Sequence, residues 1–230
     1  MSRPYVLLSV AASVDGYIDD TTDERLLVSN DADFDRVDQV RAESDAILIG
    51  AETLRRDNPR LLVKSAARRQ ARVAAGKPAN PLKVTVTRTG DIDPGARMFH
   101  HGVEAGRPVV YTTPAGAEKL AGALDGIADV VPIRADRDFW AAVLDDLGDR
   151  GIGRLMIEGG SHIHTAILSA GLADELHYAV GPMVVGDPAA PRFLNAGEYP
   201  GGSTRRMRLI DVTQIGDVAL LRYQPKETRQ

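Results

Sequence analysis

The sequence predicts an α/β protein in which a mainly parallel sheet is flanked by helices, with an antiparallel hairpin near the C-terminus. Short apolar runs alternate with amphipathic segments of helix length through residues 83–180, which is typical of parallel strands joined by crossover helices. Ile215-Gly216-Asp217 separates two strand-like segments, and glycine permits the positive φ of a tight hairpin. A length of 230 residues favours a single domain over residues 1–230, with a frayed tail at 225–230.

The composition excludes several classes of protein. Hydrophobic residues make up 43% of the chain and charged residues 26%, which excludes a disordered or fibrous protein. The chain has no cysteine, so disulfides, thiolate nucleophiles and cysteine-ligated metal sites are excluded. A net charge of −4 gives no general attraction to nucleic acid or anionic membranes, and no apolar run approaches the ~20 residues that span a bilayer. We therefore expect a cytoplasmic protein that binds neither nucleic acid nor membrane.

The N-terminal part of the chain predicts two buried strands separated by a helix. The apolar run of the first strand closes at a turn formed by Asp15-Gly16. Asn30 is a suitable N-cap for the helix, whose first turn is acidic, and Gly50 stops the second strand. The expected elements are strand Tyr5–Ala12, a helix from Asn30 to about Glu43, strand Ala46–Ile49 and a short helical or irregular piece Glu52–Arg56.

The rest of the chain begins with a polar, arginine-rich segment at 66–81, which predicts a solvated helix and a linker without an apolar face. Strands and helices then alternate as a parallel sheet requires. The expected elements are strand Lys83–Thr87, strand Pro108–Thr112, helix Ala115–Leu124, strand Ala128–Ile133, helix Asp138–Leu147, strand Arg154–Ile157, helix Ser161–Ala170, strand Glu175–Val180, and the hairpin strands Met207–Thr213 and Val218–Tyr223.

The most informative segment for function is Leu155–Ser161, a strand followed by Glu158, two glycines and a helix. Glycines let a ligand approach the backbone, and the free N–H groups at a helix start favour a phosphate. The pattern is not the GxGxxG fingerprint, so it does not predict a Rossmann fold, and a tight packing turn is the alternative. Glu158 favours a ligand site, because ligands of open α/β sheets bind at the carboxyl ends of the strands.

A second candidate segment is the loop Gly50–Leu61, which places Arg55, Arg56 and Arg60 around an Asn-Pro turn. Such a loop could bind an anion, although a solvated basic loop is the simpler interpretation. Arg88 directly follows a predicted strand and could bind a phosphate from there.

Other catalytic classes lack their motifs. His162 and His164 point about 200° apart on the predicted helix, unlike metal ligands at i and i+4. No GxSxG nucleophile elbow and no P-loop is present, so we expect no metal site, serine hydrolase or P-loop kinase.

Five segments in this order resemble the pyrimidine reductase domain of riboflavin biosynthesis, which has a dihydrofolate-reductase-like fold and is often fused behind a deaminase. The resemblance covers nearly the whole chain. The segments are Ser13-Val-Asp-Gly16, Arg41-Ala-Glu-Ser-Asp-Ala-Ile-Leu-Ile-Gly50, Thr53 through Asp57-Asn-Pro-Arg-Leu61, Glu158-Gly-Gly160, and Gly171-Leu-Ala-Asp-Glu-Leu176.

The resemblance implies an NADPH-dependent reductase that transfers a hydride to C1′ of a phosphoribosylamino-pyrimidine, with no metal or flavin. It also implies a homodimer, in which pairing would cover the edge of the C-terminal hairpin. The implied cofactor contacts are Ala12, Thr53, Asp57, Gly159, Gly160, Ser161 and, toward the 2′-phosphate, Arg88. The implied substrate contacts are Arg41, Leu61, Lys64 and Glu158, of which Glu158 is the candidate catalytic residue.

Two positions depart from the pattern of the biosynthetic enzymes, because Ser9 stands where lysine is common and Lys64 where arginine is common. A lysine lacks the planar fork of arginine, so the affinity for a sugar phosphate should be lower. The acceptor could then be the riboflavin pyrimidine or a related pterin-like or specialised metabolite. Three alternatives stay open: a folate reductase, a nucleotide-binding module without turnover, and a hydrolase or transferase that merely shares the alternation of strands and helices. We expect no deaminase half in these residues, since its zinc ligands would need cysteines and the sequence has none.

Overall fold

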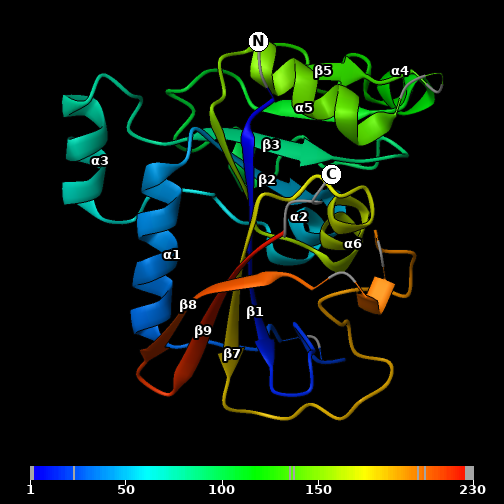
Figure 1. Ribbon diagram of the computed structural model, residues 1–230. Helices are drawn as coiled ribbons and strands as arrows, with labels where there is room; N and C mark the ends of the chain where they lie inside the picture. The colour runs from blue at the N-terminus through cyan, green and yellow to red at the C-terminus, as the bar shows by residue number, and fades with distance from the viewer. Residues whose placement is uncertain are drawn as a thin grey trace, which may run out of the picture. The chain divides into compact units, whose positions relative to one another are not determined.

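A computed structural model describes residues 3–22, 24–134, 136, 138–200, 202–204 and 206–225, which form two compact units. The first unit comprises residues up to Tyr5 and Asp38–Met156, and the second comprises Val6–Val37 and the described residues from Ile157 onward. Of the expected tail at 225–230, residues 226–230 lie outside the described residues. The elements in chain order are β1 (Tyr5–Ser13), α1 (Asp31–Glu43), β2 (Ala46–Gly50), α2 (Ala51–Asp57), α3 (Ala66–Ala74), β3 (Leu82–Val86), η1 (Arg97–Phe99), β4 (Val109–Thr112), α4 (Pro114–Leu120), β5 (Asp129–Pro132), α5 (Phe139–Asp149), β6 (Arg154–Ile157), α6 (Ser161–Ser169), β7 (Glu175–Gly181), η2 (Gly202–Thr204), β8 (Arg208–Ile215) and β9 (Val218–Gln224) (Figure 1).

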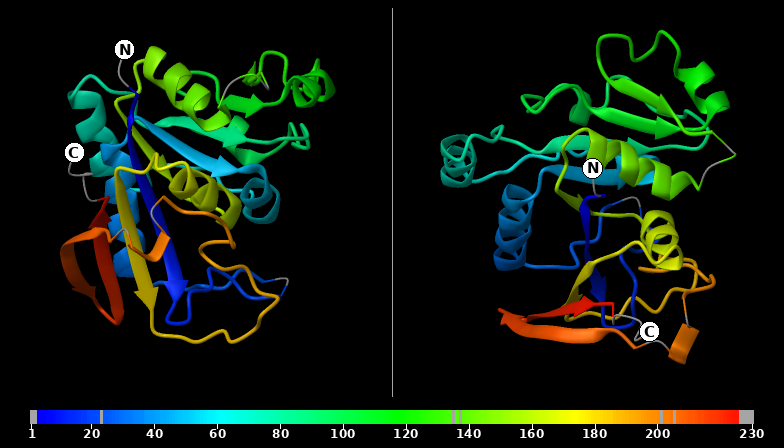
Figure 2. Two further views of the ribbon diagram at one scale, coloured as in Figure 1. Left: turned by 45° about the vertical axis from the view of Figure 1, so that its right-hand side comes forward. Right: turned by 45° about the horizontal axis from the view of Figure 1, so that its top comes forward.

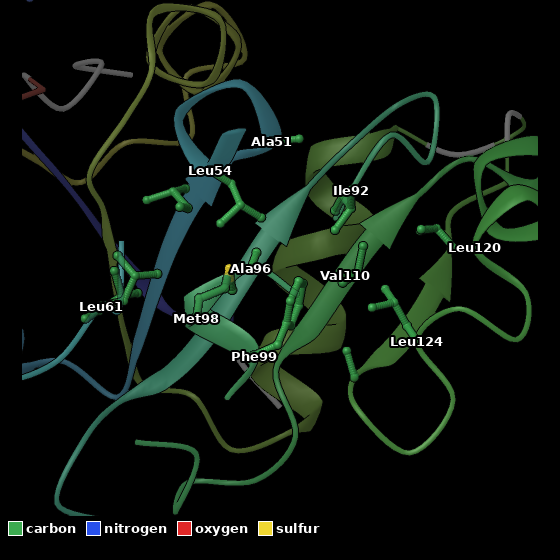
Figure 3. Close-up of a cluster of buried hydrophobic side chains, with 13 residues drawn as sticks. Ala51, Leu54, Leu61, Ile92, Ala96, Met98, Phe99, Val110, Leu120 and Leu124 are labelled. Carbon is green, nitrogen blue, oxygen red and sulfur yellow. The ribbon is translucent and has the colours of Figure 1, made fainter. Parts of the chain in front are cut away.

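In the first unit the strands follow the order β5-β4-β3-β2-β6, and β2 to β5 pair in parallel. One face of these strands carries an apolar cluster that includes Leu54 from α2, Met98 from η1 and Leu120 from α4 (Figure 3). Val110 of β4 belongs to this cluster, whereas the next residue, Tyr111, points to the opposite face and donates a hydrogen bond to Asp146 of α5 at 2.6 Å. The sheet of this unit is therefore covered by helical elements on both faces.

In the second unit the strand order is β1-β7-β9-β8 (Figure 2). β1 pairs in parallel with β7, while β7–β9 and β8–β9 are antiparallel. The tip of the β8–β9 hairpin is Gly216, whose φ of 63° lies in the region that glycine adopts without a Cβ clash. The predicted α/β fold with mainly parallel strands and a C-terminal antiparallel hairpin is thus confirmed.

One predicted helix is shorter than expected. The helix predicted to reach Leu124 ends at Leu120, because Ala121 leaves the helical region with ψ 127° and Gly122 adopts φ 79°. Leu124 is nevertheless buried in the apolar cluster. The apolar spacing that predicted a longer helix therefore reflects the burial of Leu124 in a compact turn.

The predicted solvated helix at 66–81 is held by a buried arginine. Arg72 of α3 is only 4% exposed and donates hydrogen bonds to the carbonyl oxygens of Ala42 and Ser44 at 2.7 Å and of Pro78 at 2.8 Å. The guanidinium supplies donors in a fixed fork for carbonyl groups at the end of α1. Within the described ranges, no helix is long and apolar enough to cross a membrane.

Candidate functional site

The first unit gathers several predicted site residues at one edge of its sheet. Gly50 aligns with Val86, and Val86 aligns with Tyr111, so the carboxyl ends of β2, β3 and β4 lie at the same edge. Thr53 lies in the first turn of α2, directly after Gly50, and Arg88 lies two residues beyond Val86. This edge is where open α/β sheets bind their ligands.

The turn that carries Arg88 is held in place by its backbone. The carbonyl oxygen of Arg88 accepts a hydrogen bond from Thr113 Oγ1 at 2.8 Å, while its side chain is exposed. A Cβ on Gly90 would lie 2.4 Å from the carbonyl oxygen of Gly116, so only glycine permits this approach. Arg55 is engaged by Asp91, through a hydrogen bond of 2.8 Å to the carbonyl oxygen and an ion pair of 3.5 Å. Arg55 is therefore not an open anion ligand, whereas Arg88 presents an exposed guanidinium.

The loop after α2 is fixed in an uncommon backbone conformation. Asn58 and Leu61 adopt φ of 40° and 51°, in the left-handed region that non-glycine residues seldom occupy. Asn58 Oδ1 accepts a hydrogen bond from the backbone N–H of Arg97 at 2.8 Å, and the side chain of Leu61 is buried in the apolar cluster (Figure 3). Such conformations concentrate at ligand sites, where the surrounding structure holds them. Asp57 lies directly before this loop, at the end of α2.

The last turns of α1 hold the far end of the same loop. Arg41 donates a hydrogen bond from Nη1 to the carbonyl oxygen of Leu62 at 3.0 Å. Asp38 accepts hydrogen bonds from the backbone N–H groups of Lys64 and, at 3.0 Å, of Ser65. Arg41 on α1 thus contacts the loop that carries the exposed Lys64.

Asp38 was not predicted as a site residue. Burial alone would raise the pKa of this carboxyl, but the amides of Lys64 and Ser65 and the guanidinium of Arg68 outweigh burial and hold the pKa below its usual value. A charged Asp38 therefore fixes the backbone that presents Lys64. Its position one helical turn before Arg41, and so on the same face of α1, is the signal that the sequence offered.

The second unit contains the predicted glycine turn. Glu158 follows the end of β6 and is half-buried, Gly159 has φ 128°, and Gly160 precedes the first residue of α6. No side chain caps the start of α6, whereas Ser65, Thr113 and Asp138 cap α3, α4 and α5. The first N–H groups of a helix need acceptors, so the uncapped start of α6 suits an anionic ligand.

Contacts of Arg192 and Tyr17 connect Ser161 to the turn that follows Ala12 in the second unit. The Ser161 hydroxyl donates a hydrogen bond to the carbonyl oxygen of Arg192. The Arg192 guanidinium lies 4.3 Å above the ring of Tyr17 and donates to its hydroxyl at 2.8 Å. Tyr17 in turn accepts a hydrogen bond at its carbonyl from the N–H of Ser13, the residue after the buried Ala12. Ser161 therefore uses its hydroxyl within the protein and has its backbone N–H to offer a ligand.

His164 is a further polar residue beside the glycine turn that sequence analysis did not predict as a site residue. Its ring is fully buried, its Nε2 lies 3.6 Å from the position of a Cβ on Gly159, and its centroid lies 5.4 Å from that of Phe193. Burial lowers the pKa of His164 to about 4, so the imidazole is neutral. His162 is exposed, which confirms that the two histidines point to different sides of the helix.

Comparisons with known proteins identify relatives along the whole chain. Residues 4–221 match the family described as the RibD C-terminal domain. A 2,5-diamino-6-ribosylamino-4(3H)-pyrimidinone 5′-phosphate reductase from Archaeoglobus fulgidus is 34% identical over 215 residues, which cover 94% of this chain and 95% of that protein. The enzyme of the same name from Methanothermobacter thermautotrophicus is 36% identical over 196 residues, 85% of each protein.

Solved structures agree with these relatives. Acinetobacter baumannii RibD matches with a TM-score of 0.78 and 27% identity, and the match covers 98% of this chain and 59% of that one. A pyrimidine reductase-like protein from Corynebacterium diphtheriae matches with a TM-score of 0.83 at 22% identity, covering 98% and 93% of the two chains, which is a likeness of fold.

Proposed function

Because the chain belongs to the RibD C-terminal domain family, we propose that it acts as a single reductase domain that uses NADPH to reduce a phosphoribosylamino-pyrimidine. The observation that carries this proposal is the near full-length match to two reductases that are named for such a substrate. Both named relatives support the diamino-pyrimidinone phosphate as the first substrate to test. The corresponding uracil, which differs by an oxo group in place of one amino group, is the second.

The reaction requires a hydride and a proton. When bound, NADPH supplies the hydride, which adds to C1′ of the ribosylamino group. The bond from C1′ to the ring oxygen breaks, and that oxygen takes up a proton, so the ribosyl group becomes a ribityl chain. The protein has to hold C1′ against the nicotinamide and exclude competing water, because the reduction chemistry belongs to the cofactor.

Cofactor binding at the glycine turn is supported by the uncapped start of α6 and by the buried polar nitrogens of His164 beside Gly159. We assign the pyrophosphate to the N–H groups that follow Gly160, including that of Ser161. In the first unit, Arg88 would meet the 2′-phosphate that distinguishes NADPH from NADH, and Thr53 and Asp57 would contact the cofactor from α2. In the second unit Ala12, at the end of β1, completes the proposed set.

Substrate binding is proposed for Arg41, Leu61, Lys64 and Glu158. The cation Arg41 on α1 contacts the loop that carries the cation Lys64, which suits a sugar phosphate. Glu158 lies at a strand end, where a carboxylate can accept hydrogen bonds from hydroxyl or amino groups of the substrate. Lys64, in place of an arginine, contributes a point charge and not a planar fork.

The test measures NADPH oxidation by its absorbance with three substrates in turn, the diamino-pyrimidinone phosphate, the uracil phosphate and dihydrofolate. We expect turnover with a pyrimidine phosphate. Turnover with dihydrofolate alone would favour a folate reductase, and binding of NADPH without turnover of any substrate would favour a nucleotide-binding module. Glu158→Gln, which keeps size and loses charge, should lower kcat and leave NADPH affinity intact. A structural carboxylate would instead lower stability and leave turnover of the folded protein unchanged.

A homodimer through β8 is also proposed. β8 is the last strand of the order β1-β7-β9-β8, and it and the preceding residues expose Met207, Leu209 and Val212 at 40%, 49% and 59%. An exposed apolar edge strand favours pairing with a second copy. Sedimentation of the wild type should give a dimer and that of Val212→Lys a weaker one. A monomeric wild type at micromolar concentration would exclude this arrangement.

A further inference from the structure

The second unit buries two histidines, and the proposed mechanism uses neither. His164 lies on α6 and is 0% exposed, and His177 lies on β7 and is 5% exposed. A buried imidazole has two ring nitrogens that both need hydrogen-bond partners. The two residues differ in whether the protein provides those partners.

His177 is satisfied at both nitrogens. Arg36 Nη1 lies 3.3 Å from Nδ1, so Nδ1 is the acceptor because a guanidinium can only donate. Nε2 lies 2.9 Å from Glu175 Oε1 and donates to that carboxylate. Glu175 also accepts from Arg222 Nη2 at 2.6 Å. This cluster is complete without any ligand.

His164 has no such partners. Within the described ranges, neither Nδ1 nor Nε2 of His164 has a hydrogen-bond partner, and its ring packs edge-on against the apolar ring of Phe193. Leaving buried polar nitrogens unpaired destabilises a fold, and each such group in a native protein calls for an explanation. A ligand that brings the missing partner provides one.

The position of the Nε2 atom indicates where that ligand lies. The Nε2 atom lies 3.6 Å from the position of a Cβ on Gly159, and no other described residue beyond the chain neighbours comes within 4 Å of that position. The backbone N–H of His164 already donates to the carbonyl oxygen of Gly160 at 3.1 Å, so the residue is fixed at the turn. The unpaired nitrogen therefore lies next to the backbone of Gly159, at the turn before the nine-residue helix α6, whose start no side chain caps.

We propose that Nε2 of His164 donates a hydrogen bond to a phosphate oxygen of the dinucleotide bound at the Gly159-Gly160 turn, and that this donor is satisfied only in the complex. The inference rests on the proposed function, which provides the dinucleotide, and it adds a cofactor-binding residue beside the turn. It also accounts for a polar residue in an otherwise apolar place. A leucine at this position would make the cofactor-free protein more stable and would bind the dinucleotide less tightly.

The experiment compares wild type, His164→Leu and His164→Gln by calorimetric titration with NADPH and by thermal unfolding without cofactor. His164→Leu should weaken NADPH binding roughly ten-fold or more, because a hydrogen bond to a charged group is lost. The same variant should unfold at a temperature about 3 °C higher, because no polar group is left unpaired. His164→Gln retains an N–H donor and should bind NADPH within about three-fold of wild type.

His177→Leu is the matched control, because it makes the same change at the other buried histidine. It should lower the unfolding temperature, since Glu175 and Arg36 lose a partner, and leave NADPH affinity unchanged. Titration with ADP, which keeps the diphosphate but lacks the nicotinamide and the 2′-phosphate, tests the phosphate contact. His164→Leu should weaken the binding of ADP by the same factor as the binding of NADPH.

Equal NADPH affinity in wild type and His164→Leu would overturn the inference and leave the proposed function standing. A cofactor-free His164→Leu protein that is less stable than wild type, or unfolded, would show that the imidazole already has a partner, and it too would overturn the inference. A wild type that binds neither NADPH nor NADH would instead reject the proposed function and the inference with it.

Discussion

His164 and His177 lie in the same unit and are both buried, but they differ in the polar contacts of their ring nitrogens. His177 is enclosed by Arg36, Glu175 and Arg222, which pair every charge and ring nitrogen. His164 lies against Phe193 and the glycine turn with both ring nitrogens unpaired in the described part of the chain. The comparison teaches that a complete polar network stabilises the protein alone, whereas an incomplete one beside an uncapped helix indicates where a ligand completes the structure.

The largest expected effect tests the complete polar network around His177. Glu175→Gln should lower the free energy of unfolding in urea by about 3 kcal/mol, because the 4% exposed carboxylate accepts from Arg222 at 2.6 Å and from the buried His177 at 2.9 Å, and both charge-assisted hydrogen bonds are lost. NADPH affinity of the folded variant should not change. Asp136→Asn is the control, because its 3.5 Å pair with Arg134 is exposed and should contribute little. Equal, small losses in both variants would show that the buried network does not stabilise the protein.

The unpaired, buried His164 predicts that the stability of the protein depends on pH. Burial lowers the pKa of His164 to about 4 from an ordinary value of 6.5. Between these pH values the imidazole is protonated in the unfolded chain and neutral in the folded protein. The free energy of unfolding should therefore fall as the pH falls from 6.5 to 4, by about 3 kcal/mol from this residue. Urea titrations across that range measure it as the difference between wild type and His164→Leu. Parallel pH profiles for the two proteins would contradict the assignment.

Gly160→Val sharpens the comparison at the turn itself. Gly160 has φ −88° and ψ −161°, which a β-branched residue can adopt, so the fold should persist by circular dichroism. The side chain would intrude where the pyrophosphate approaches the backbone, and NADPH affinity should fall roughly 100-fold through the loss of two hydrogen bonds. Gly197→Val, in an exposed segment with only ordinary contacts, is the matched control. A folded Gly160→Val protein with wild-type affinity would show that the turn serves packing alone.

The smallest expected effect concerns Arg88, which is exposed and so screened by solvent. Arg88→Ala should weaken NADPH binding about ten-fold and leave NADH binding unchanged, because only NADPH carries the 2′-phosphate. Calorimetric titration of both cofactors measures the preference. An equal loss for NADPH and NADH would place the arginine elsewhere on the cofactor.

The sequence contained most of the fold and the outline of the site. The periodicity predicted β6 at Arg154–Ile157, and the glycines at 159 and 160 predicted the turn before α6. Leu124 was assigned to a helix because helical spacing and burial in a turn give the same apolar signal. The assignments of site residues stay predictions.

The remaining features depend on partners that are distant in sequence. Arg72 is buried because carbonyl groups at the end of α1 accept its hydrogen bonds, and no local pattern encodes that contact. The helical angle between His162 and His164 correctly separated their directions, but the absence of partners around His164 depends on Phe193, which comes from another segment. An unpaired buried nitrogen is visible only once the whole environment is known.

The central claim, hydride transfer from NADPH to C1′ of a phosphoribosylamino-pyrimidine, is tested most directly with NADPH deuterated at the transferring position of C4. The protein is incubated with the diamino-pyrimidinone phosphate, and the product is analysed by mass spectrometry and NMR. The account predicts a ribitylamino product that carries deuterium at C1′. A reduced product without deuterium at C1′, or NADPH that is bound but never oxidised with any pyrimidine phosphate, would contradict it.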